Sequence, residues 1–125
     1  MRKSPPIKRG SGPRRSKRIK PVNRARKAKR WRTSFGSHER VEWMQQLNCC
    51  VCGRTPCEVA HVRSRGAGGT AADTVPLCGR CHREQHAVGV ETFAARHDLD
   101  LTALAAKYDR WWTTGLESGR WVLGF

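Results

Sequence analysis

Two Cys-x-x-Cys pairs, Cys49/Cys52 and Cys78/Cys81, stand 25 residues apart in a chain of 125 residues. The short spacer lets both sulfurs of a pair reach one ion at about 2.3 Å, and four thiolates satisfy the tetrahedral coordination of structural zinc. A fold that brings the two pairs together must bend the intervening chain back on itself. We therefore predict that one zinc ion, held by these four cysteines, organises the fold.

Six cysteines in a short chain would also suit a secreted, disulfide-bonded protein. However, the basic N-terminus is followed by no apolar segment of the kind that a secretory signal needs, and no stretch is apolar enough to cross a membrane. We therefore expect a cytoplasmic protein with reduced thiols, in which this spacing indicates metal. Cys50 and Cys57 are expected to be buried thiols, although Cys50 could compete for the zinc.

The positive charge of the chain is concentrated at its N-terminus. Residues 1–32 contain fifteen Lys/Arg and no Asp/Glu, whereas residues 33–125 contain ten of each, so the net charge of +15 belongs to the first segment. This segment is also rich in Pro and poor in apolar residues, which predicts a disordered basic arm before one folded domain over residues 33–125. The arm would bind phosphates without reading sequence, or serve only as a solubilising or localisation tail. The arm residues expected to contact phosphate include Arg14, Arg15, Lys17, Arg18, Arg30 and Arg32.

The folded part is predicted to be a small α+β domain, a zinc-stapled hairpin with flanking helices. Its apolar residues alternate where strands are expected and recur at helical spacing elsewhere. The aromatic residues of the last helix, Tyr108, Trp111 and Trp112, are expected in the core. In chain order, we expect a helix over residues 37–47, strands over residues 57–62 and 75–77, and helices over residues 80–88, 90–97 and from Asp100 onward.

Three histidines lie within or just after the segment that the cysteines bracket. His82 and His86 are four residues apart on a predicted helix, so they share one face and could hold one divalent ion. His61 lies on the first predicted strand, and a neutral imidazole with a pKa near ~6.5 is suited to take a proton from water. Asp73 precedes the second strand and could accept a hydrogen bond that orients His61 or its loop.

Other interpretations of these residues stay open. His82 directly follows Cys81 and could replace one of the cysteines as a zinc ligand. His38 and His97 have no such neighbours and are expected at the surface. Five of the ten Lys/Arg of the folded part lie between residues 54 and 83, where phosphate contacts would be needed. Those expected to bind nucleic acid are Arg63, Arg65, Arg80 and Arg83.

Three stretches carry a resemblance to a known family. They are CCVCG at residues 49–53, AHVRSRGAGG at residues 60–69 and VPLCGRCHREQH at residues 75–86. Together they resemble the HNH endonuclease superfamily, and the similarity extends from residue 49 to about residue 112. It is closest to a phage-associated branch that includes the recombination-enhancement nucleases and related phage HNH proteins.

The resemblance implies a ββα-metal (HNH) domain with His61 as general base, His82 and His86 as ligands of a catalytic Mg²⁺ or Mn²⁺, and Asp73 in the place of the middle Asn of the family name. It also implies a bacterial or phage-infected host cell, and a role in phage recombination or DNA processing with a protein partner. The chain departs from the family at Ala60, where a His or Asp commonly ligates the catalytic ion. Water, Asp73 or Glu84 would have to supply that ligand.

We therefore expect a metal-dependent DNA endonuclease that cuts or nicks duplex, single-stranded or branched DNA with little sequence specificity. It would use structural Zn²⁺ and a second, catalytic ion, and it would need no membrane. The alternative is a non-catalytic zinc-knuckle protein that binds DNA or RNA, and the departure at Ala60 is the best support for it.

Overall fold

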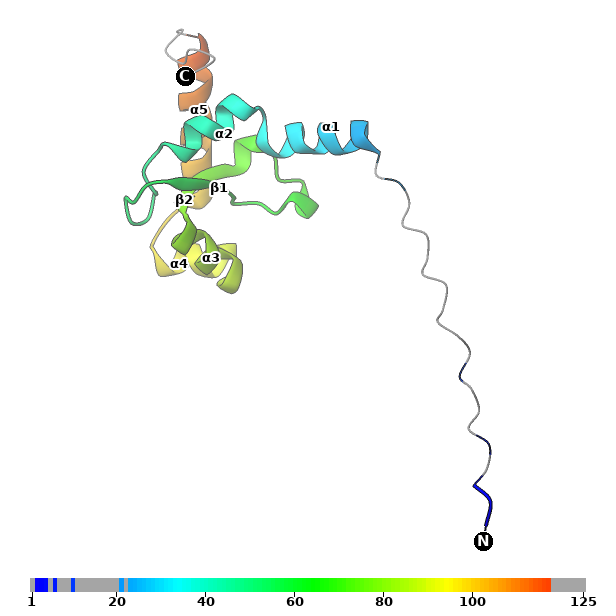
Figure 1. The fold of residues 1–125 in the computed structure, drawn as a ribbon. Helices are drawn as coiled ribbons and strands as arrows, with labels where there is room; N and C mark the ends of the chain where they lie inside the picture. The colour runs from blue at the N-terminus through cyan, green and yellow to red at the C-terminus, as the bar shows by residue number, and fades with distance from the viewer. Residues whose placement is uncertain (1, 5, 7–9, 11–20, 22, 118–125) are drawn as a thin grey trace.

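A two-stranded antiparallel hairpin lies at the centre of the computed structural model (Figure 1), which describes residues 2–4, 6, 10, 21 and 23–117. Strand β1, Cys57–His61, pairs with β2, Thr74–Cys78, so that Cys57 is opposite Cys78 and His61 is opposite Thr74. All residues of β2 are buried. The small α+β class and both predicted strands are confirmed.

Helix α3, Gly79–Val88, begins directly after β2 and completes a strand–strand–helix unit. It ends at Gly89, whose φ of 89° is favourable only for glycine and whose N–H donates to the carbonyl of Gln85. The short helix α4, Val90–Arg96, then packs back on α3 and buries Phe93 completely. Both helices lie close to their predicted positions.

The other side of the hairpin is covered by α2, His38–Gln45, and α5, Leu101–Glu117. Ser37 caps α2, and Asp100 accepts a hydrogen bond from a backbone N–H in the first turn of α5, as predicted. Trp43 of α2 packs against Trp112 of α5 with ring centroids 5.3 Å apart. Trp111, however, is 49% exposed, so its predicted place in the core was wrong.

A buried arginine ties these helices to the hairpin. The side chain of Arg40 donates to Thr74 Oγ1 at 2.9 Å and to Asp109 Oδ1 at 3.3 Å. Its guanidinium is therefore paired, as a buried charge requires. This contact connects α2, β2 and α5.

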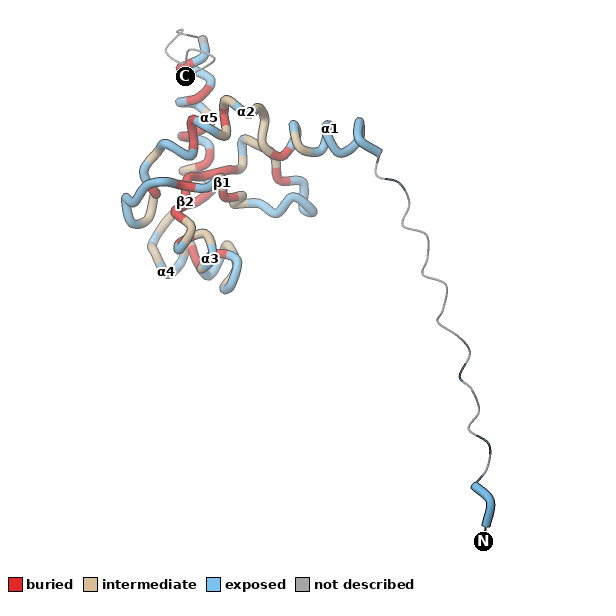
Figure 2. Tube along the Cα trace, viewed as in Figure 1, coloured by how far each residue is buried: buried red, intermediate tan, exposed pale blue. Residues whose placement is uncertain are grey.

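Helix α1, Arg24–Phe35, is the main departure from the sequence-based prediction. The basic arm was expected to be disordered as far as residue 32, but the chain is helical from Arg24, after an N-cap in which Asn23 Oδ1 accepts from Arg26 N. The prediction of disorder rested on the high charge of this segment. It did not consider that Arg, Lys and Ala are strong helix formers. Most of α1 projects from the domain and is exposed (Figures 1 and 2). Within the described residues, no helix has the length and apolar content that a membrane crossing requires.

Candidate metal centre and histidine site

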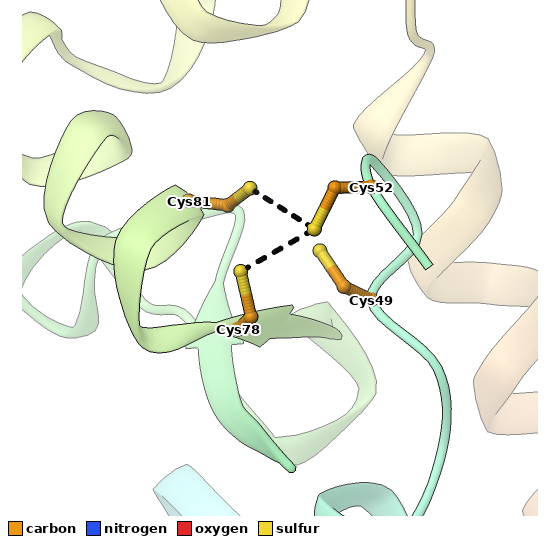
Figure 3. Close-up of side chains that lie close together, drawn as sticks. All are labelled: Cys49, Cys52, Cys78 and Cys81. Carbon is orange, nitrogen blue, oxygen red and sulfur yellow. Dashed lines mark hydrogen bonds between the residues drawn. The ribbon is translucent and has the colours of Figure 1, made fainter. Parts of the chain in front are cut away.

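The four predicted zinc cysteines come together beside the start of α3 (Figure 3). The Sγ atoms of Cys49, Cys52, Cys78 and Cys81 all lie within 4.8 Å of one another. The Sγ of Cys52 is 3.5 Å from that of Cys78 and 3.8 Å from that of Cys81. Four sulfurs around one zinc ion at about 2.3 Å would be roughly 3.8 Å apart. The cluster therefore fits a tetrahedral metal ion such as zinc.

The electrostatics of the cluster also call for a cation. Burial opposes ionisation of Cys49, but hydrogen bonds from backbone N–H groups, chiefly those of Cys52 and Cys78, outweigh burial and lower its pKa to about 7. The pKa of Cys81 is instead raised, by burial and by the neighbouring sulfurs. Sulfurs this close cannot all ionise unless a positive charge lies between them, and a bound metal ion supplies that charge.

The remaining cysteines stand outside this cluster. Cys50 is half-buried, and burial raises the pKa of its thiol to about 12. Cys57 is buried, and its thiol donates to the carbonyl of Arg54 at 3.3 Å. Among the described residues, the tetrad is the only group of three or more Cys, His, Asp or Glu side chains placed to hold an ion. The alternative in which Cys50 competes for zinc has no support.

His82 and His86 face each other across one turn of α3. Their Nε2 atoms are 3.1 Å apart. Two imidazole nitrogens on one ion, each at about 2.1 Å, would lie roughly 3.0–3.4 Å apart, so the pair has the spacing of two ligands. The other nitrogen of His82, Nδ1, lies 2.6 Å from Oε2 of Glu58 on β1. A carboxylate in this position accepts the proton of Nδ1 and so fixes the tautomer in which the Nε2 lone pair can bind an ion. His82 is not a member of the cysteine cluster, so its predicted alternative role as a zinc ligand has no support.

His61, the predicted general base, lies at the end of β1 and is half-buried. Its Nε2 is 2.7 Å from the carbonyl oxygen of Ser34 at the end of α1. Because a carbonyl can only accept, Nε2 carries the proton and Nδ1 keeps its lone pair. Burial lowers the pKa of His61 below its usual 6.5, against the opposing effect of the Ser34 carbonyl, so the ring is neutral at pH 7.

The three histidines border one surface hollow of about 410 Å³, called the histidine hollow below. That volume has room for a phosphodiester group together with an ion and several waters. The side-chain amide of Gln85 donates to the carbonyl of His61 at 3.2 Å and so ties α3 to the end of β1. The other lining residues are Phe35, Val59, Ser64, Arg65, Gly89 and Val90.

Asp73 holds the loop rather than the ring of His61. Its carboxylate accepts hydrogen bonds from the backbone N–H and the hydroxyl of Thr70, at 2.9 and 3.3 Å. Its carbonyl accepts from the N–H of Val62, next to His61, at 2.8 Å. Of the two roles considered for Asp73, the structure supports orientation of the loop, and Ser34 makes the contact with the ring.

Glu84 points away from the histidine pair, on the side of α3 that faces α4. Its Oε1 lies 2.9 Å from His97 Nε2 and 3.6 Å from Arg96. Ala60 is completely buried and offers no ligand. Glu84 and Asp73 therefore both bind other groups. Neither of them provides a third ligand for an ion at the His82/His86 pair.

The predicted phosphate-binding arginines are all exposed where the structure describes them, but they occupy different surfaces. Arg65 alone among the four in the folded part borders the histidine hollow. Its Nε donates to Ser34 Oγ at 2.9 Å, and its guanidinium lies 5.4 Å from the centre of the Phe35 ring. Exposed positions elsewhere are taken by Arg63, Arg80, Arg83, Arg30 and Arg32, while Arg14, Arg15, Lys17 and Arg18 lie outside the described residues.

Two residues of this site, Ser34 and Glu58, were not predicted from the sequence. Ser34 acts through its backbone carbonyl from 27 residues before His61, and Glu58 reaches His82 from 24 residues away. Any residue type can make a contact through its backbone carbonyl, so the sequence did not indicate the role of Ser34. The one available signal was the position of Glu58 on the strand that carries His61.

Comparison with known proteins gives a family. No curated protein and no solved structure matches this chain. The family described as "Protein of unknown function (DUF968)" matches residues 21–115. The match begins just before α1 and includes the four clustered cysteines and the three histidines of the hollow. This chain therefore belongs to the DUF968 family.

Proposed function

We propose that this protein is a metal-dependent endonuclease that hydrolyses phosphodiester bonds in DNA. The observation that carries the proposal is the histidine hollow, where His61 lies beside two imidazoles whose Nε2 atoms are 3.1 Å apart. One phosphate in this hollow would meet both a proton acceptor and an ion site. The choice of DNA rests on the resemblance to HNH endonucleases, because a base that activates water could also activate the 2′-hydroxyl of RNA.

The residues have distinct roles in this mechanism. His61 takes the proton of the attacking water at Nδ1, since Nε2 is committed to Ser34. Arg65 contacts a non-bridging oxygen and orients the phosphate. His82 and His86 would hold a divalent ion, which would supply positive charge to the phosphate and to the oxygen that leaves as its bond to phosphorus breaks.

Nicking of supercoiled plasmid by the full chain tests the proposal, with Mg²⁺, Mn²⁺ or Ni²⁺ added in turn because imidazole ligands suit transition-metal ions. His61→Ala is expected to slow nicking by about 10²–10⁴-fold, the usual contribution of a general base. His61→Gln, which keeps a donor for Ser34, should be equally impaired. The control is Glu91→Ala, since Glu91 is an exposed residue of α4 that does not border the histidine hollow. Nicking that survives both changes at His61 while zinc is retained would exclude His61 as the base.

The second candidate is a zinc-knuckle protein that binds nucleic acid without cleaving it. It is favoured by the buried Ala60 and by the lack of a third ligand beside His82 and His86 among the described residues. The same assay separates the two candidates. Retention of DNA without nicking in any of the three ions would favour the binder.

A further inference from the structure

The histidine hollow continues into a strongly basic groove along α1. Arg65 borders the histidine hollow and also two further hollows beside α1. Both of these are bordered by Arg26 and Arg30, and one of them reaches Lys29 and the backbone of the 63–70 loop. We call this surface, bordered by Arg26, Lys29, Arg30 and Arg65, the α1 groove.

The cations of α1 surround the helix, and only those on one side of it border these two hollows. Lys29 and Arg30 lie three and four residues after Arg26, so these three share the face toward the groove, and Lys27 borders one of the two hollows. Arg24, only two residues before Arg26, lies about 200° around the helix and borders none of these hollows. Helix α1 contains no acidic residue, and within the described part of the chain its cations form no ion pair.

The end of the groove nearest the histidines is fixed in place. Arg65 is held by its hydrogen bond to Ser34 Oγ and by the ring of Phe35. The loop opposite α1 is equally constrained, because Gly69 is buried and a Cβ there would overlap the carbonyl of Arg63. Ser34 thus accepts a hydrogen bond from Arg65 at its hydroxyl and one from His61 at its backbone carbonyl. These two contacts connect the α1 groove to the histidine hollow.

We propose that a DNA strand bound at the histidine hollow continues past Arg65 along the α1 groove, where Arg26, Lys29 and Arg30 contact its phosphates. The choice of DNA rests on the proposed function, whereas the position of the groove does not. Helix α1 has 12 residues and is about 18 Å long, enough to lie beside several consecutive phosphates of a bound strand. The family match starts at residue 21 and so includes α1.

Binding of a fluorescent DNA duplex by the full chain tests the groove. Anisotropy is measured over a range of salt without added divalent ion, so that cleavage plays no part. The slope of log binding constant against log salt concentration should become less steep by about 1 for each phosphate contact that is lost. Arg26→Gln should therefore reduce the slope by about 1, and R26Q/R30Q by about 2. Arg24→Gln removes the same charge from the same exposed helix and should leave the slope unchanged. Glutamine is a good helix former, and circular dichroism checks that α1 persists.

The outcomes separate the groove from the nuclease. The proposed groove would be overturned if Arg24→Gln and Arg26→Gln reduced the slope equally, or if R26Q/R30Q left it unchanged. Tighter binding of an RNA of the same length, with the arginine effect seen only there, would overturn DNA as its occupant. A slope for DNA that falls in R26Q/R30Q but not in Arg24→Gln supports the groove, even if the unmodified protein nicks no plasmid. Absence of nicking would count against the proposed function alone.

Discussion

The two parts of the molecule that meet at His61 are held in place by different interactions. The hairpin and α3 are joined by four clustered sulfurs and a fully buried strand. Helix α1 is exposed along most of its length and contacts the domain chiefly through Ser34, Phe35 and the ring of Trp31, which stacks on His38 at 4.3 Å. The site therefore combines a rigid half with a half that is held by a few contacts at one end of α1.

The largest effect is expected from breaking the rigid half. Removal of zinc, by chelation or by Cys78→Ser, should unfold the hairpin and α3. Structural zinc contributes about 10–16 kcal/mol in small zinc-finger peptides, as much as the whole stability of a typical domain. Circular dichroism during thermal unfolding, with zinc quantified in parallel, measures the loss.

A matched variant makes this zinc test specific. Cys50→Ser removes a thiol that lies outside the cluster, so it should keep one zinc ion per chain and a cooperative transition. A chelated protein that still unfolds cooperatively at the original temperature would show that the cysteine cluster is not the staple.

The contrast between the halves also explains what the sequence could predict. The cysteine pairs and the His82/His86 pair are encoded at spacings of three and four residues, so local geometry alone brings each pair together. The hairpin then follows, because only a reversal of the chain can join the two cysteine pairs. These features were predicted correctly.

Helix α1 was missed because its order depends on contacts that are distant in sequence. The prediction gave more weight to the high charge of residues 1–32 than to the helix propensity of Arg, Lys and Ala, and the contacts that anchor α1, such as Phe35 against His61 with ring centroids 5.2 Å apart, join residues distant in sequence. The exposure of Trp111 was missed for a different, local reason: Lys107, one turn earlier in α5, lies 4.7 Å from its ring centre, and helical spacing alone does not distinguish such a surface contact from core packing.

A smaller and local effect should follow from Glu58→Ala, which tests how the rigid half positions its histidines. Loss of a carboxylate that orients a ligating histidine typically weakens metal binding by about 10–100-fold. Titration of the zinc-loaded protein with Mn²⁺, followed by electron paramagnetic resonance, should show this loss at the His82/His86 pair. Glu91→Ala removes an exposed carboxylate from α4 and is the control. Unchanged Mn²⁺ affinity in the Glu58 variant would mean that the 2.6 Å contact has no influence on the ion site.

The smallest effect should appear in α1 itself when only the salt concentration is changed. Arg26 has like charges three and four residues away, at Lys29 and Arg30, and each such pair destabilises a helix by about 0.2–0.5 kcal/mol until salt screens it. Raising the salt concentration should therefore slow amide hydrogen exchange in α1 by a few fold. Exchange in α3, which the cysteine cluster holds, should stay constant and serves as the internal control. If α1 exchanged at the same rate at every salt concentration, repulsion among its cations would not govern its stability.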